Sequence, residues 1–314
     1  MIRVVMLGTS ASVPSVARNL CSVGLRYAGE VYLFDCGEGT QRQMMKYGLS
    51  YARVRAIFIS HLHADHYLGI AGLCHTLKMI GRKSDEELLI VGPRGIARVV
   101  DGLGCSYEFV KVKEVEAGGS GRAGAGEGEF GAAVYRGKGE SRGSEGFSVH
   151  AFAVEHGRNA LGYVFEEDAG KNYDKAKCDA LGIKGVMFRE LEKKGELSVG
   201  GKKVKVADVS TPKKGKKIVY TGDTHMCEAV VKAAHEADVL IHDGTFGEER
   251  RAEADEREHA TAGDAAKVAK KAKAKLLIVT HISNRYEKTD ALLKEARQVF
   301  ANTKIAQDGM ELDL

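Results

Sequence analysis

The sequence predicts an α/β fold in two halves, with sheets packed inside and helices outside. The first observation behind this prediction is that short β-rich runs alternate with helical segments along the chain. The second is that this order occurs twice, before and after a glycine-rich stretch at residues 117–146. With 314 residues, the chain is long enough for one large domain, residues 1–314, with insertions.

The N-terminal third is expected to contain short strands, because its β-rich runs are bounded by glycine or polar residues. The expected strands are Arg3–Leu7, Ser22–Tyr27, Val31–Asp35, Ala56–Ser60 and Leu88–Val91. Two segments in this region have a helical pattern, Thr40–Lys46 and His66–Met79. The glycine-rich stretch 117–146 holds 11 glycines and cannot bury enough apolar surface to order itself, so we expect a flexible insertion.

The second half repeats the pattern. The expected strands are Phe147–Val154, Tyr163–Glu166, Ile218–Tyr220, Val239–His242, Leu276–Thr280 and Lys304–Ala306. The expected helices are Cys227–Ala237, Ala262–Ala274 and Asp290–Phe300. We find no apolar run of membrane-spanning length and no signal-peptide cleavage site, so we expect a cytoplasmic protein without a membrane partner. The six cysteines are scattered and form no CxxC pair, which indicates reduced thiols.

The net charge of +4 hides an uneven distribution. Residues 171–217 hold 14 Lys and Arg against 6 Asp and Glu, a balance of +8 that leaves about −4 for the rest. A basic segment on a weakly acidic body is typical of a protein that binds a polyanion. A solvated, lysine-rich surface would give the same composition, so charge alone leaves both interpretations open.

The segment His61-Leu62-His63-Ala64-Asp65-His66 carries the strongest chemical signal. Neutral imidazole and ionised carboxylate are ligands for divalent metals such as zinc. On an extended segment His61 and His63 face the same way, whereas Asp65 and His66 turn toward a second position. One short loop can therefore supply two adjacent metals, which suits attack on a phosphoryl or acyl centre.

A site with two metals needs further ligands, and α/β folds place them after strands. His156, Asp223 and His281 each follow an expected strand. One carboxylate must bridge the two metals, and Asp223 is placed to do so. Each of these residues taken alone could equally be a polar residue at a strand end.

The histidine cluster with His156, Asp223 and His281 resembles the metal-binding motifs of the metallo-β-lactamase superfamily. Other segments resemble tRNase Z, the family of endonucleases that remove tRNA 3′ trailers. These segments are LFDCGEGTQRQ at 33–43, LGTSASVP at 7–14 with Arg18 and Asn19, EHAT at 258–261, and THISNRY at 280–286. The resemblance implies an αββα sandwich with two central mixed sheets.

The resemblance also implies roles for the site residues. His61, His63 and His156 would bind one Zn²⁺, and Asp65, His66 and His281 a second, with Asp223 bridging them. Asp35 would orient a ligand histidine. Asp65 would position the attacking water, and His259, paired with Asp243, would protonate the leaving 3′ oxygen.

The implied substrate is a precursor tRNA cut after the discriminator base, leaving a 3′-OH on the tRNA and a 5′-phosphate on the trailer. In the family, an inserted arm presents tRNA to the active site of a partner subunit, so residues 171–217 are expected to be this arm and the protein a homodimer. The expected RNA-binding residues are Arg18, Asn19, Lys184, Lys193, Lys194 and Arg285. His225 stands where the family has arginine.

Two other functions fit parts of the sequence. The metal motif also permits a hydrolase of small phosphodiesters, thioesters, lactones or sulfate esters, although the basic segment and the motif at 33–43 argue against it. An RNA-binding member with purely structural metals is the second alternative. The presence of every expected ligand, together with His259, argues against an inactive protein.

Overall fold

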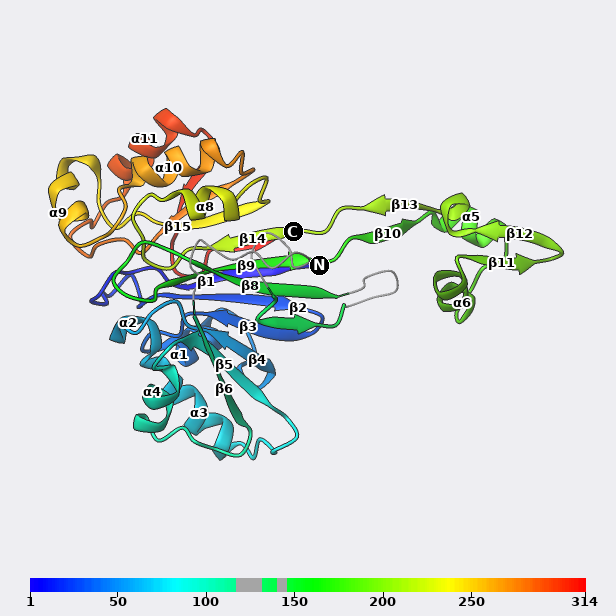
Figure 1. The fold of residues 1–314 in the computed structure, drawn as a ribbon, viewed down its shortest axis with the longest axis horizontal. Coiled ribbons are helices and arrows are strands. Elements are labelled where there is room, and N and C mark those ends of the chain that lie inside the picture. Colours follow the sequence, from blue (N-terminus) through cyan, green and yellow to red (C-terminus); the bar gives the residue numbers. More distant parts are fainter. Residues whose placement is uncertain (117–131, 140–145) are drawn as a thin grey trace.

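The computed structural model describes residues 1–116, 132–139 and 146–314. The glycine-rich stretch that we expect to be flexible, 117–146, therefore lies mostly outside the described residues. Two seven-stranded sheets face each other, and helices cover the outer face of each (Figure 1). The predicted αββα sandwich with two mixed sheets is confirmed.

The first sheet is built from the N-terminal half and the last strand of the chain. Its order is β18 (Glu311–Asp313), β1 (Arg3–Gly8), β2 (Ser22–Tyr27), β3 (Glu30–Phe34), β4 (Val54–Phe58), β5 (Leu88–Pro93) and β6 (Val110–Val115). Pairing is antiparallel from β18 to β3 and parallel from β3 to β6. The elements on its outer face are α1 (Thr40–Lys46), the 3₁₀ turn η1 (Tyr51–Arg53), α2 (Ala64–Tyr67), α3 (Gly69–Met79) and α4 (Ile96–Gly102).

The second sheet comes from the C-terminal half. Its order is β17 (Thr303–Ile305), β16 (Leu277–Thr280), β15 (Val239–Asp243), β14 (Lys217–Tyr220), β9 (Leu161–Glu167), β8 (Phe147–Ala153) and β7 (Tyr135–Gly137). Parallel pairing joins β14 to β17, and antiparallel pairing joins β14 to β7. The elements on this side are α8 (Glu228–Ala233), η2 (Glu248–Arg250), α9 (Arg251–Glu256), α10 (Ala262–Lys271) and α11 (Asp290–Val299).

Aromatic side chains fill the space between the sheets. Phe58 of the first sheet lies 5.4 Å, between ring centroids, from Tyr163 of the second. Tyr27 meets Phe147 edge to face at 5.4 Å. Burying one such ring stabilises the fold by roughly 1.5–3 kcal/mol, and the aromatic geometry adds to this. This central core therefore holds the two halves in a fixed relation.

Between β9 and β14 the chain leaves the body and forms an arm, residues 170–213 (Figure 1). The arm consists of β10 (Gly170–Tyr173), α5 (Lys175–Ala180), α6 (Met187–Lys194), β11 (Glu196–Val199), β12 (Lys202–Lys205), α7 (Val206–Val209) and β13 (Ser210–Lys213). It has a small core of its own, made of Cys178, Ile183, Leu191, Val204 and Val209. The arm therefore ends at 213, whereas the basic segment continues to 217 and into β14.

Some elements differ from the sequence prediction. The expected helix His66–Met79 starts earlier, at Ala64, and is divided at Leu68 into α2 and α3. The edge strands β6 and β18 were not predicted, because their exposed positions carry charges instead of an apolar run. Helices α4 and α9 and the arm elements were not predicted either, and β7 is a strand within the stretch expected to be flexible. In the described part of the chain no helix is long and apolar enough to cross a membrane.

Candidate metal centre

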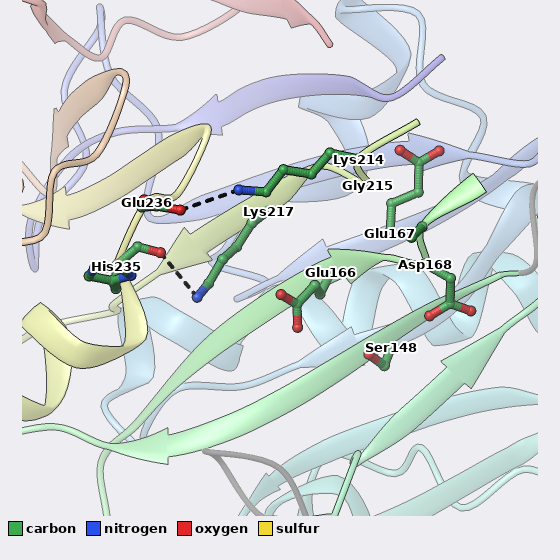
Figure 2. Close-up of a pocket in the computed structure, with 10 residues that line it drawn as sticks. Ser148, Glu166, Glu167, Asp168, Lys214, Gly215, Lys217, His235 and Glu236 are labelled. Carbon is green, nitrogen blue, oxygen red and sulfur yellow. Dashed lines mark hydrogen bonds and ion pairs between the residues drawn. The ribbon is translucent and has the colours of Figure 1, made fainter. Parts of the chain in front are cut away.

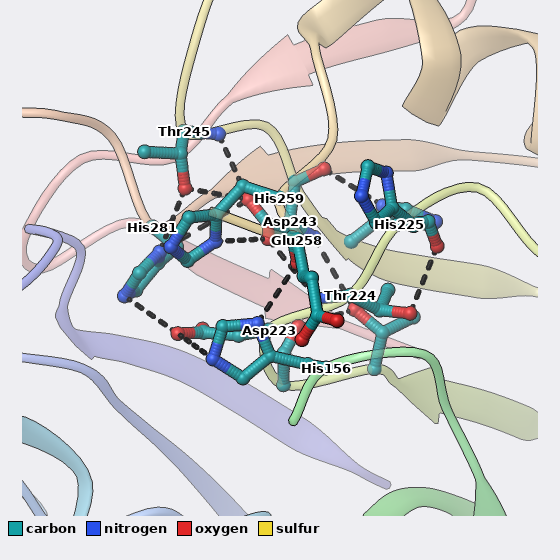
Figure 3. A network of polar contacts seen from close by, with 12 residues as sticks. His156, Asp223, Thr224, His225, Asp243, Thr245, Glu258, His259 and His281 are labelled. Carbon is teal, nitrogen blue, oxygen red and sulfur yellow. Dashed lines mark hydrogen bonds and ion pairs between the residues drawn. The ribbon is translucent and has the colours of Figure 1, made fainter. Parts of the chain in front are cut away.

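Residues from both sheets meet where several strands end at the same edge of the sandwich. His61 follows β4, His156 follows β8, Asp223 follows β14 and His281 follows β16. Helix α2 adds Asp65 and His66. Figure 3 shows His156, Asp223 and His281 turned toward one another. The fold thus brings together all seven side chains that the sequence predicts as metal ligands.

Three imidazoles form the first group. His61 Nε2 lies 2.9 Å from His63 Nδ1, and His156 Nε2 lies 3.4 Å from the same His63 nitrogen. His61 and His156 are buried, whereas His63 is exposed. Together with a carboxylate oxygen of Asp223, these nitrogens lie within 4.8 Å of one another.

A carboxylate and two imidazoles form the second group. Asp65 Oδ2 lies 3.5 Å from His66 Nε2 and 3.6 Å from His281 Nε2. Asp65 Oδ2 also accepts a 2.9 Å hydrogen bond from the backbone N–H of Ser12, so the loop after β1 reaches the site. His281 has a φ of 58°, a left-handed backbone that a non-glycine residue adopts at a cost.

Asp223 lies between the two groups. Its Oδ2 is 3.5 and 3.9 Å from the Nε2 atoms of His61 and His156. The same oxygen is 3.3 Å from the Nε2 atoms of both His66 and His281. Asp223 is buried, and four imidazoles surround one of its oxygens. This is the position of a carboxylate that two cations can share.

Hydrogen bonds behind the cluster fix the tautomers of the four buried imidazoles. His66 Nδ1 donates to Asp35 Oδ2 at 2.7 Å, and His156 Nδ1 donates to the Glu258 carbonyl at 2.8 Å. The Ser60 hydroxyl donates to Asp35 and therefore accepts from His61 Nδ1 at 3.0 Å. In the same way Thr245 Oγ1 donates to Asp243 and accepts from His281 Nδ1 at 2.8 Å (Figure 3).

In their neutral form, these four imidazoles therefore present an unprotonated Nε2 atom to the centre of the cluster. Among the described residues, His66 Nε2, His281 Nε2 and Asp223 Oδ1 are buried with no hydrogen-bond partner. Orphaned polar atoms are costly inside a protein, and a cation would satisfy them together. The residues present thus fit a divalent metal site.

The electrostatics of the site agree with this arrangement. Burial and the neighbouring imidazoles lower the pKa of His61 and His63, so both are neutral at pH 7. Burial opposes a charge on His66, but Asp223 and Asp35 raise its pKa well above the usual value. A metal that binds His66 Nε2 must therefore displace a proton.

His259 and Asp243 form a separate pair at the edge of the cluster. His259 precedes α10, whose N-cap residue Thr261 forms a capping box with Asp264. His259 Nδ1 donates to Asp243 Oδ2 at 2.8 Å. Burial lowers the pKa of His259, but the Asp243 carboxylate outweighs it and raises the pKa to about 9. Asp243 also accepts from the backbone N–H groups of Thr224 and Thr245. With Asp223, His259 and His281 it forms a third group whose possible ligand atoms lie within 4.8 Å of one another.

The predicted RNA-binding residues fall in different environments. Arg18 is half-buried and donates to Thr9 Oγ1 and to the Ala306 carbonyl, both at 2.7 Å. The Asn19 side chain donates to the Glu38 carbonyl at 2.8 Å. Arg285 is paired with Glu253. On the arm, Lys184, Lys193 and Lys194 are exposed, and Lys194 is paired with Glu190.

Sequence reasoning missed the groups that support the ligands. Ser60, Thr245, Tyr220 and the Glu258 carbonyl all hold a ligand histidine or Asp35 in place. Ser60 is adjacent to the histidine cluster in sequence, which is a usable signal. His225 donates from its backbone N–H to the Glu155 carbonyl and from Nε2 to the Asp255 carbonyl, so it ties together loops around the site (Figure 3).

Comparison with known proteins gives agreement along the whole chain. A family model described as a beta-lactamase superfamily domain matches residues 174–282, and one described as anti-Pycsar protein Apyc1 matches residues 2–94. A ribonuclease Z of Methanosarcina acetivorans is 39% identical over 318 residues, which cover 100% of this chain and 98% of that protein. A ribonuclease Z of Pyrococcus abyssi is 40% identical and covers 91% of this chain and 88% of that protein.

Solved structures agree with these relatives. The short form of human tRNase Z is 27% identical with a TM-score of 0.65, covering 99% of this chain and 98% of that chain. The metallo-β-lactamase fold protein YhfI of Bacillus subtilis has a TM-score of 0.69 at 17% identity, covering 99% of this chain and 98% of that chain, which shows the shared fold.

Replacing Asp35 tests whether the hydrogen-bond network tunes the metal site. In Asp35→Asn the amide cannot accept from all four donors that surround it, so His66 loses its orientation. We expect divalent metal affinity to fall by about 10–100-fold, as measured by competition with a chromogenic chelator. Asp85→Asn, an exposed position, is the matched control. Equal affinities of the two variants would contradict the role of Asp35.

Proposed function

Since this chain belongs to the ribonuclease Z family of the metallo-β-lactamase superfamily, we propose that it is a zinc-dependent endoribonuclease that removes the 3′ trailer of precursor tRNA. The observation that carries the zinc assignment is the convergence of four imidazoles on Asp223 Oδ2, with Asp65 and His63 completing the two groups. Full-length similarity to ribonuclease Z from several organisms supports the substrate.

The two metal positions follow from the grouping of the ligands. His61, His63 and His156 would hold one Zn²⁺. Asp65, His66 and His281 would hold the other, and Asp223 would serve both. When bound, the two ions would supply Lewis-acid activation of water and of the phosphoryl oxygens. The chain's own part is to hold these ligands aimed at one point through the hydrogen bonds behind them.

Asp65 has a second task beside metal binding. Its Oδ2 faces the site, while the Ser12 N–H holds the carboxylate in position. A carboxylate placed in this way can accept a hydrogen bond from the attacking water and orient it toward phosphorus. We therefore propose Asp65 as the residue that positions the nucleophile.

His259 is the proposed general acid. Its Nδ1–H is committed to Asp243, so Nε2 is the atom that can carry a proton toward the substrate. The raised pKa, about 9, means that the imidazole holds this proton at neutral pH. Transfer to the departing 3′ oxygen leaves a 3′-OH on the tRNA and a 5′-phosphate on the trailer.

The arm is the proposed tRNA-binding exosite, and its place favours a dimer. β9 begins beside the site, where the Leu161 N–H donates to the Ser60 carbonyl, and ends at Glu167 where the arm departs. A seven-residue strand is about 23 Å long, so the arm leaves from the end of the sheet opposite the site and extends away from it (Figure 1). We propose that it presents tRNA to the site of a second subunit, by shape and backbone charge.

The direct test is cleavage of a precursor tRNA that carries a 3′ trailer, with both product ends mapped. We expect a single metal-dependent cut beside the discriminator base. Asp65→Ala and a chelator-treated sample should lose it. Hydrolysis of a small phosphodiester without any tRNA cleavage would move the function to a small-molecule hydrolase of the same superfamily.

The role of His259 is tested by comparing two substrates, one whose leaving group needs a proton and one whose leaving group does not. On precursor tRNA, whose leaving oxygen needs a proton, His259→Ala should lower kcat by about 10²–10⁴-fold. On bis(4-nitrophenyl) phosphate, whose phenolate leaves unprotonated, the loss should be much smaller. If both substrates lose activity equally, His259 is not the general acid.

The dimer is tested by complementation. Asp65→Ala has an intact arm but an impaired site, and a chain lacking 171–213 has an intact site without an arm. Each should fail on precursor tRNA, whereas mixed and refolded chains should regain activity, because one supplies the arm and the other the site. Light scattering that shows monomers at micromolar concentration, or a mixture without activity, would rule out this arrangement.

A further inference from the structure

A short junction joins the arm to the body, and the side chain of Glu167 makes most of its polar contacts. Pairing of β9 with β14 runs as far as Glu166 opposite Lys217, and pairing of β10 with β13 resumes at Gly170 opposite Lys213. Residues 168–169 and 214–216 lie between these two ladders. The contacts made at this junction therefore set the direction in which the arm leaves the sheet.

Glu167, the last residue of β9, joins three parts of the molecule. Its side chain is buried, with 7% of the residue exposed. Its Oε1 accepts from the Tyr27 hydroxyl of the opposite sheet at 3.1 Å and from Lys213 Nζ of the arm at 3.3 Å. Its Oε2 accepts from the backbone N–H of Lys216 at 3.3 Å. A buried carboxylate needs such partners, so these contacts act together.

The backbone at the junction is also tightly packed. The Glu167 N–H donates to the Lys216 carbonyl at 2.8 Å. A Cβ atom added at Gly215 would lie 1.8 Å from the Glu167 carbonyl oxygen, far inside contact distance. Any side chain at 215 must therefore push the two strands of the junction apart.

The lysines that follow the arm face acceptors of the body. Lys214 Nζ lies 3.3 Å from Glu236 Oε2, and Lys217 Nζ donates to the His235 carbonyl at 3.3 Å (Figure 2). Lys216 Nζ lies 3.5 Å from Asp238 Oδ1. With Lys213 on Glu167, every lysine from 213 to 217 has such a partner. Each exposed pair contributes little stability, but all of them point toward the body.

We propose that Glu167 is a positioning residue that fixes the direction of the arm, and that the lysines at 213–217 anchor the arm instead of binding RNA. The inference rests on the proposed function in so far as the arm is the tRNA exosite. If the lysines at 213–217 anchor the arm, then RNA binding falls to lysines farther along the arm, such as Lys184 and Lys193. Among the described residues, these two have no ion-pair partner.

The first test measures the direction of the arm without any substrate. Spin labels at Lys202→Cys on the arm and Lys294→Cys on the body report the distance within one chain when labelled chains are refolded with an excess of unlabelled chains, because the six native cysteines are buried. The otherwise unchanged protein should give one narrow distance distribution. Glu167→Gln and Gly215→Ala should broaden it, and Lys270→Ala, an exposed position on α10 of the body, should leave it unchanged. An unchanged width in both junction variants would overturn the proposal.

The second test asks whether Glu167→Gln raises or lowers the KM for precursor tRNA. Glu167→Gln removes a negative charge beside the basic arm, so electrostatics alone would tighten tRNA binding. Anchoring predicts the opposite, a KM for precursor tRNA raised by about tenfold. The kcat for bis(4-nitrophenyl) phosphate should stay unchanged, which shows that the body is folded. A lowered or unchanged KM in Glu167→Gln would contradict the proposal.

Gly215→Ala is the control for the loss of charge, because it perturbs the same junction by steric contact and removes no carboxylate. It should also raise the KM for precursor tRNA. Failure of the parent protein to cut any precursor tRNA would instead remove the proposed function. The distance measurement would still decide whether Glu167 anchors the arm.

Discussion

The buried carboxylate of Asp35 is the interaction on which the site depends. Asp35 follows β3 in a left-handed conformation, with a φ of 56°, and is fully buried between the sheets. It accepts from the backbone N–H and hydroxyl of Ser60 at 2.7 and 2.8 Å, from the Tyr220 hydroxyl at 2.6 Å, and from His66 Nδ1 at 2.7 Å. These donors come from both halves of the fold, so the Asp35 carboxylate joins the two halves and orients the His66 imidazole. The strain and the cost of burying the charge are offset by these bonds.

The second sheet carries the candidate metal centre at one end and the arm at the other. At one end, β14 leads to Asp223 and β9 begins at Leu161, beside the candidate metal centre. At the other end the same two strands continue into the arm, and Glu167 holds the junction. The separation is a consequence of strand length, and it places the candidate metal centre and the arm at opposite ends of the same sheet. A second subunit would bring the two ends of different chains together.

The side chains that the sequence predicts as ligands lie together in the fold, and the sequence could predict them because their signal is local. Six residues, 61–66, contain four of them, and His156, Asp223 and His281 each follow an apolar strand. The supporting network was not predictable in this way, since Tyr220 is 185 residues from Asp35 and the Glu258 carbonyl has no side-chain signature. Charge counting located the arm but could not distinguish lysines that face solvent from Lys213 and Lys216, which face carboxylates of the body.

The central proposal is that the seven side chains would hold two metal ions, with Asp223 serving both. Anomalous scattering from crystals of the zinc-loaded protein, collected on both sides of the zinc absorption edge, tests it most directly. The account predicts two anomalous peaks, one beside His61, His63 and His156 and one beside Asp65, His66 and His281, with Asp223 between them. A single peak, or metal bound by Asp243 and His259, would contradict it.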